Sequence, residues 1–463
     1  MSQAPGSNGP KIALGVSVFV GIFAILLWRS LQPKIRTATP EEIHAILPKI
    51  LQDPIPVDSA GRERYQKLMS FLKQTDFKSV EGQIDIKKKK ADEAYAAMKR
   101  FWNSHPTLVE DFASVLNAGS LQVLPLDPND YKASEAITTN SRSFIRVVEM
   151  SARLSADHGE YEASTKLHLL GISFVDKILK AGGPIINYIV AASNEGIVNA
   201  AIDRTALIPG LPTSDCQQLL AALTPAPEKD NAFALSVKED FLRYGMTVLP
   251  DPTRNPKEFL QNQVGTDGEP DSTPQEPIVG TYDAIETTKI YSNAIAITMA
   301  NAMRPYSKID NSAFIAIEKD SKQLPQEVDN SEPDGAGKTL KKWKYRFQMN
   351  NSHNSLGRQF VSQATMGEGF SESSYRWRAQ REATRILLAS RLYRSAHGGK
   401  LPDTIDGFVP LLGKWPTDPY NGLPMVYNAK TQKVYSVGKN LVDDGGDIGV
   451  DLFKALDIGL SLR

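Results

Sequence analysis

Apolar residues recur every three or four positions along most of this chain, which is the spacing of an α-helix. In 133–207 this pattern includes Phe144 and Val147, and it is interrupted at Gly159 and at the Gly-Gly-Pro of 182–184. Glycine and proline disfavour a continuing helix, so the stretch predicts three consecutive helices. Further helices are predicted to start at Pro40 and to cover about 60–74, 82–103, 213–223, 230–246, 281–304, 356–365 and 374–396.

The predicted helices follow one another through short turns, as in antiparallel helical hairpins. No 34-residue period recurs, so the sequence predicts an α-helical array and not a true repeat protein. An ordinary helical domain remains the alternative.

Two segments break the helical pattern. Residues 250–280 are rich in Pro, Gly, Asp and Asn and predict a surface loop, whereas the polar 318–341 predicts a mobile one.

The pattern changes to strand-like alternation near the carboxyl end. A turn signal at 418–422 precedes two short alternating runs, 425–427 and 433–437, which are separated by a polar stretch. This arrangement predicts a β-hairpin and a small α+β module. The fold class is therefore mainly α, with a small module at its end. The predicted divisions are a tail at 1–11, a span at 12–28, a helical segment at 37–130, a helical body at 131–380 and the module at 381–463.

Residues 12–28 are uncharged and almost wholly apolar. As a helix they reach about 26 Å, near the lower limit for crossing a bilayer core. No small-residue cleavage site follows, so an uncleaved, single-pass signal-anchor is predicted, with a buried core helix as the alternative. Lys11 precedes the span, whereas Arg29, Lys34 and Arg36 follow it. Because the more positive flank usually stays in the cytoplasm, this charge difference by itself favours a cytoplasmic body.

Composition excludes several classes of function. Lys plus Arg equals Asp plus Glu at 53 each, so no nucleic-acid partner is expected, and the Lys87–Lys90 run is interpreted as a solvated helix face. Cys216 is alone, which excludes an intramolecular disulfide and a cysteine-based zinc site. The six histidines show no metal-ligand spacing, and the familiar nucleophile and phosphate-binding motifs are missing.

One acidic loop suggests a metal ion. Asp443, Asp444 and Asp447 lie among glycines, and calcium prefers several carboxylate and carbonyl oxygens. Asp418 or a carbonyl near Ser436 is expected to complete such a shell. The role would be structural, since an ion bound only by the folded form stabilises it. A solvated acidic turn is the alternative.

The carboxyl-terminal motifs resemble those of the type II secretion major pseudopilins. The shared features are the turn and hairpin of "PTDPYNGLPMVY", the "YSVG" strand and the acidic "DDGGD" loop. A group of membrane-anchored bacterial proteins without an assigned activity is similar over more of the chain. In that group the same module follows a helical body with a G-[DE]-Y-E-A turn and an N-x-L-G-R segment, which match Gly159–Ala163 and Asn354–Arg358.

The resemblance implies a bacterial inner-membrane protein whose body lies outside the cytoplasm, and it implies the calcium-binding role of the loop. Two departures from the pseudopilin pattern limit the resemblance. Lys439 and Asn440 precede the acids where pseudopilins more often have another acid, which weakens the calcium expectation. The prepilin-peptidase signal is missing, which argues against assembly into a pilus. We therefore expect an envelope protein that is a non-enzymatic binding or scaffold protein with a protein partner. The alternatives are a hydrolase with a carboxylate site between body and module, or a secretion-system component.

Overall fold

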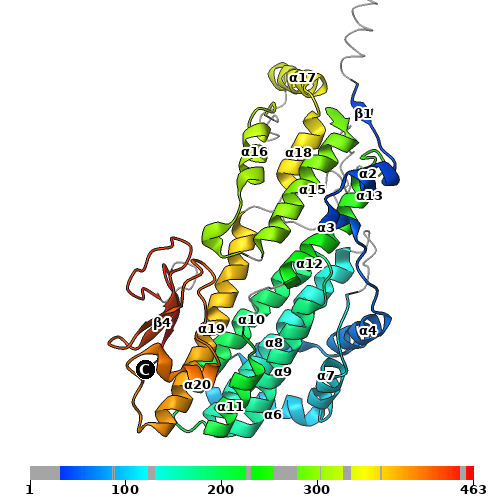
Figure 1. Cartoon of the computed structure of the whole chain (residues 1–463). Helices are drawn as coiled ribbons and strands as arrows, with labels where there is room; N and C mark the ends of the chain where they lie inside the picture. The colour runs from blue at the N-terminus through cyan, green and yellow to red at the C-terminus, as the bar shows by residue number, and fades with distance from the viewer. Residues whose placement is uncertain are drawn as a thin grey trace, which may run out of the picture. The chain divides into compact units, whose positions relative to one another are not determined.

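The computed structural model describes residues 32–85, 87, 89–123, 131–225, 231–254, 279–302, 304–326, 335–364, 368–448 and 455–462. The chain is mainly helical, with a two-stranded and a three-stranded sheet in the described part (Figure 1). It forms two compact units. Unit 1 comprises 1–53, 242–296 and 311–366, and unit 2 comprises 54–241, 297–310 and 367–463.

Unit 2 is organised around four long helices. These are α8 (Tyr131–Asp157), α9 (Tyr161–Lys180), α10 (Ile185–Ala206) and α19 (Glu368–Ala396), and α10 packs against the other three (Figure 1). The three helices predicted in 133–207 are confirmed. Gly159, Gly182 and Gly183 have φ values of 76°, 71° and 94°, a left-handed conformation that only glycine adopts at little cost.

Shorter helices cover one side of this group: α4 (Ser59–Gln74), α5 (Phe77–Ile84), α6 (Ala91–Ser104) and α7 (Leu108–Asn117). Their shared core is aromatic, with Phe144 of α8 stacked on Phe112 at 4.4 Å and edge-on to Phe77 at 5.1 Å. The prediction of one helix over 82–103 is wrong. α5 ends at Ile84 and α6 begins at Ala91, because the polar run between them contains no buried described residue to continue an apolar stripe.

A buried charge cluster fastens α19 to its neighbours. The Arg381 guanidinium donates to Asp176 of α9 at 2.9 Å, to Glu195 of α10 at 2.7 Å and to the Thr224 carbonyl at 2.8 Å. The two carboxylates raise the pKa of Arg381 further above its ordinary value, against the effect of burial. The cluster fixes how α19 lies on α9 and α10. α11 (Thr213–Ala222) and α12 (Asn231–Asp240) complete the helical body.

Beyond α19 the predicted hairpin is confirmed. β3 (Val426–Asn428) pairs with β4 (Lys433–Ser436) in antiparallel fashion. The sequence pattern missed β5 (Ile458–Ser461), which pairs with the other edge of β4. Two short helical turns, η3 (Ile405–Gly407) and α20 (Val409–Leu412), precede the hairpin, and a further turn of the unit is η2 (Tyr306–Lys308).

Unit 1 is built on a parallel strand pair. β1 (Lys34–Arg36) pairs with β2 (Thr281–Asp283), and α2 (Pro40–Ile46) and α3 (Lys49–Gln52) follow β1. Pro40 starts α2 as predicted, after Thr39, which forms a reciprocal capping box with Glu42. The unit also contains the helices α13 (Met246–Val248), α16 (Ser312–Ser321), α17 (Ala336–Asn351) and α18 (Ser355–Ala364). Two helices are shared with unit 2: the last four residues of η1 (Phe241–Gly245) and the first part of α15 (Ala284–Asn301) belong to unit 1.

The prediction of a mobile segment over 318–341 is wrong at both ends. α16 extends to Ser321 and α17 begins at Ala336, while 327–334 lie outside the described residues. Most of the loop predicted at 250–280 also lies outside them, at 255–278.

The predicted membrane span at 12–28 lies outside the described residues as well. Among the residues that the structure does describe, α10 alone is long and apolar enough to cross a bilayer by length and composition. Half of its apolar window is buried within the protein, and the helix carries buried Asn194, Glu195 and Asn199. These features are those of an interior helix.

Candidate functional site

The three aspartates predicted to bind calcium lie on one loop but do not converge. Asp443 accepts hydrogen bonds from the Tyr435 hydroxyl at 2.9 Å and from the Gly445 backbone at 2.9 Å, and Asp444 accepts one from Asn440 at 2.7 Å. No three His, Cys, Asp or Glu side chains gather around a common point within the described residues. The arrangement therefore does not form a ligand shell as it stands, and calcium binding stays a prediction.

Asp418, the further candidate ligand, is held by hydrogen bonds within the protein. It is fully buried, and it accepts hydrogen bonds from the backbone of Tyr420, from the Ser436 hydroxyl and from the backbone of Val437 at 2.7–2.9 Å. Its carboxylate thus ties the turn to strand β4. The sequence analysis missed Asp457, which is also fully buried and accepts from the backbone of Gly446 and Asp447 at 2.9 and 3.1 Å.

The Gly159–Ala163 motif makes a joint between helices. Gly159 ends α8, and the carboxylate of Glu160 accepts hydrogen bonds from the Tyr95 hydroxyl at 2.6 Å and from Lys99 at 2.9 Å. These donors lower the pKa of Glu160 below its ordinary value. The motif therefore holds α6 against the α8–α9 turn.

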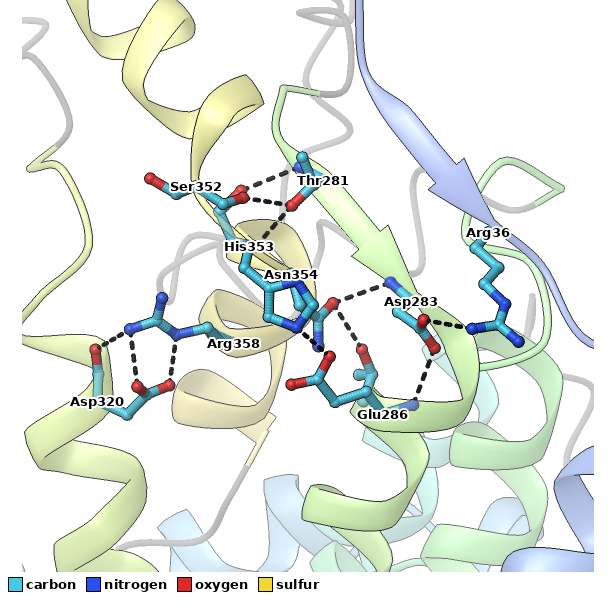
Figure 2. Close-up of polar contacts among 11 residues, drawn as sticks. Arg36, Thr281, Asp283, Glu286, Asp320, Ser352, His353, Asn354 and Arg358 are labelled. Carbon is cyan, nitrogen blue, oxygen red and sulfur yellow. Dashed lines mark hydrogen bonds and ion pairs between the residues drawn. The ribbon is translucent and has the colours of Figure 1, made fainter.

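The Asn354–Arg358 motif is likewise structural (Figure 2). Asn354 adopts a left-handed φ of 44°, and its side-chain oxygen accepts from the Asp283 backbone at 2.9 Å and from Thr287 at 3.1 Å. Arg358 reaches Asp320 of α16 through its Nη2, at 2.8 Å from Oδ1 and 2.7 Å from the backbone carbonyl. Asp283 also accepts from Arg36 of β1 at 3.0 Å. The motif joins α18 to β2, α15 and α16.

A cavity of about 440 Å³ lies within unit 2, a volume typical of small-molecule sites. Its walls come from α8, α10, α19 and the loop that precedes α6. α10 faces the cavity with the small residues Ser193, Gly196 and Ala200, which leave space beside Met150 and Trp377. A Cβ added at Gly196 would lie in ordinary contact with Gln380 and Trp377 of α19, at 3.7 and 3.9 Å. Most of the lining is apolar.

Five cationic side chains border the cavity, against two acidic ones. The cations are Lys87, Arg146, Arg153, Arg204 and Arg376, and the acids are Asp85 and Glu149. Three of the arginines already have carboxylate partners: Arg146 with Glu81 at 2.7 Å, Arg376 with Glu372 at 3.1 Å and Arg153 with Asp157 at 3.7 Å. These pairs hold the arginines in place but reduce the charge that each can offer a ligand.

Arg204 differs from the other arginines in its neighbour. It is exposed, and the carboxyl beside it in sequence belongs to Asp203. Burial raises the pKa of Asp203 to about 7, with Thr384 and Arg204 opposing that effect. Near neutral pH this carboxyl is therefore only partly ionised, and it compensates Arg204 less than a surface carboxylate would. Arg204 is the best-placed group for an anion.

A buried polar chain leads from Glu149, at the cavity wall, into the interior of the unit. His168 Nδ1 is 2.6 Å from Oε2 of Glu149, and its Nε2 is 3.0 Å from the Thr205 hydroxyl. Burial raises the pKa of the Glu149 carboxyl, and His168 only partly offsets this effect. The other oxygen, Oε1, lies against Gly171 of α9, where any larger residue would overlap it.

This chain of Glu149, His168 and Thr205 resembles a catalytic arrangement in composition, but it is sealed. The exposed fractions are 2%, 0% and 0%. A general base or nucleophile must reach the atoms of its substrate, and these groups instead join α8, α9 and α10 to one another.

Sequence analysis did not find the cavity. Its residues come from stretches up to 295 positions apart, between Asp85 and Gln380, so no local pattern brings them together. The one local signal is the spacing of small residues along α10, which is also common in closely packed helices.

Comparison of the chain with protein-family models, with curated proteins and with solved structures finds no match. The function therefore has to be argued from the site itself.

Proposed function

We propose that the protein is a single-pass, membrane-anchored envelope protein whose helical body binds a small amphipathic anion in the cavity of unit 2. The observation that carries the proposal is the combination of an apolar wall with a cationic border. An apolar lining stabilises a ligand's hydrocarbon or aromatic part, and a few fixed charges orient it. Arg204 is the residue expected to pair with the anionic group.

The anchor, the array and the module are parts of the same proposal. Residues 12–28 have the length and composition of a span, and the hairpin with its buried Asp418 supports a pseudopilin-like module. The consecutive long helices α8, α9 and α10 support a helical array that presents a binding site. A protein partner or a link to a secretion system is compatible with this placement and is not needed to explain the cavity.

The test uses the full chain in lipid nanodiscs, with naphthalene-2-sulfonate as an anionic probe and naphthalene-2-methanol as its neutral counterpart. Ala200→Phe should fill the cavity and abolish the binding of both compounds in titration calorimetry. Arg204→Gln should weaken the sulfonate about tenfold or more, because it removes a charge-assisted hydrogen bond, and should leave the neutral compound unchanged.

Arg142→Gln is the matched control. This arginine is exposed on α8 and does not line the cavity, so its loss should leave both affinities unchanged. Thermal melting shows whether each variant is folded. If folded Ala200→Phe binds the sulfonate as tightly as the parent chain does, the cavity is not the site and the proposal is wrong.

A further inference from the structure

Helix α17 has an exposed apolar stripe. Leu340, Trp343 and Phe347 are separated by three and four residues, which places them on one face of the helix. Their exposed fractions are 65%, 37% and 38%, and the Trp343 and Phe347 rings stack at 5.5 Å. Met349, near the end of the helix, is 1% exposed and lies on the opposite side. The stripe therefore faces away from the body of unit 1.

The same helix is strongly basic. It carries five cations and no Asp or Glu between Ala336 and Asn351. Lys341 and Lys344 are exposed and border the apolar stripe along one edge. A helix with an exposed aromatic and aliphatic face flanked by lysines is typical of segments that lie in the interface of a bilayer. Such lysines are attracted to anionic lipid headgroups, while Trp and Phe suit the boundary between headgroups and acyl chains.

The position of α17 in unit 1 supports the same partner. Only five residues lie between the end of the predicted anchor at Trp28 and Lys34 of β1, so β1 begins within about 20 Å of the bilayer. β1 pairs with β2, and the end of α17 is tied to β2 by the Gly280 amide, which donates to Asn350 at 2.6 Å. Figure 1 shows α17 at the same end of unit 1 as the first residues of β1.

We infer that α17 is a second membrane contact, which lies in the interface of a bilayer containing anionic phospholipid and fixes unit 1 against it. The inference rests on the anchor that forms part of the proposed function, and it is independent of the cavity. Leu340, Trp343 and Phe347 enter the interface, and Lys341 and Lys344 face the lipid phosphates.

The test places a spin label on the full chain in nanodiscs. Leu340→Cys is labelled in one variant and Ile315→Cys in its control. Ile315 is a similarly exposed apolar residue of unit 1, at 63%, on helix α16, where Lys319 is flanked by the acids Glu318 and Asp320. Cys216 is buried and should not react with the label. Labelling of the unsubstituted chain tests this expectation. The discs contain phosphatidylcholine alone or with about one third phosphatidylglycerol.

In the anionic discs the label at 340 should gain contact with oxygen and lose about half or more of its access to a water-soluble nickel reagent. The label at 315 should stay in water in both lipids. Lys341→Glu combined with Lys344→Glu should return the label at 340 to water without changing the label at 315.

If the chain is inserted and the label at 340 stays in water in both lipids, the inference is wrong while the anchor stands. If the chain does not insert, the prediction of a membrane anchor is wrong. Cosedimentation of the full chain with phosphatidylglycerol vesicles then tests the membrane contact of α17 separately. Binding that depends on Lys341 and Lys344 would support it, and no binding would overturn it. Immobilisation of the label by polyuridylate, without lipid contact, would assign the face to nucleic acid and also overturn it.

Discussion

Asp203 is a carboxyl group whose protonation is coupled to folding. Its Oδ1 is buried and has no hydrogen-bond partner among the described residues, and burial raises its pKa from 3.8 to about 7. A raised folded-state pKa means that the folded chain retains a proton that the unfolded chain releases. The stabilisation from this proton is complete below about pH 4 and is lost as the pH rises through about 7.

Asp203→Asn should therefore stabilise the protein at about pH 8, by about 2 kcal/mol in the free energy of unfolding, and should have little effect below about pH 4. Urea unfolding of the full chain at several pH values measures the difference. Asp92→Asn is the control, because the side chain of Asp92 is fully exposed at 100%. An Asp203→Asn gain that does not vary with pH would contradict the assignment.

Single residues also show where sequence reasoning succeeds and fails. Gly159 and Gly182 were identifiable because a glycine at the end of an apolar period predicts a helix terminus from local pattern alone. Asp203 was not identifiable, because its burial depends on how α19 lies against α10. Asp418 was identified as a turn residue, but its burial against β4 depends on contacts that no local pattern describes.

At the scale of elements, the close approach of α18 to α15 depends on Gly357. A Cβ at this position would overlap the Thr287 hydroxyl and the Asn354 side chain, which belong to the network in Figure 2. Gly357→Ala should therefore destabilise the protein by about 1–3 kcal/mol, since a packed contact must open. Thermal unfolding of the full chain, followed by circular dichroism, measures the loss.

Gly337→Ala is the matched substitution, in helix α17 of the same unit. No atom lies within 4 Å of an added Cβ there, and the backbone does not have a positive φ. Alanine should be neutral or stabilise the helix by up to about 1 kcal/mol, because it restricts the unfolded chain. Equal effects of the two substitutions would show that the contact at Gly357 is not a packing constraint.

Long helices with clear ends were predictable, and elements that depend on distant partners were not. The hairpin of β3 and β4 is local and follows from alternation and turn residues. β5 is four residues long, and it is a strand because β4 offers it an unpaired edge. The sequence predicts a mobile loop over the first residues of α17, because its exposed lysines dominate the average polarity while its three apolar residues face outward.

At the scale of the whole molecule, the sequence predicts consecutive domains, whereas compact packing groups distant segments. Unit 1 draws on three separate stretches. β1 and β2 pair although Arg36 and Asp283 are 247 positions apart, and local patterns do not show such pairing. The cavity has the same origin, since its walls belong to stretches far apart in the sequence. The predicted divisions at 130 and 380 stay predictions about sequence composition.

The proposed placement of the body outside the cytoplasm makes a prediction for the whole chain. Two arguments oppose each other, because Arg29, Lys34 and Arg36 follow the span and favour retention inside. That rule holds best for short loops, and long domains are translocated largely regardless of charge. The region after the span is hundreds of residues long, so its few positive charges are a weak guide. We therefore give more weight to the resemblance of the module to pseudopilins, which function outside the cytoplasm.

Proteinase K added to intact spheroplasts should degrade the body and leave only a short protected fragment around 12–28. A cytoplasmic marker must survive in the same sample, and detergent must expose both. Survival of the full-length chain beside that marker would place the body inside the cytoplasm. The proposed envelope location would then be wrong, whereas the proposed anchor and the cavity site would not be affected.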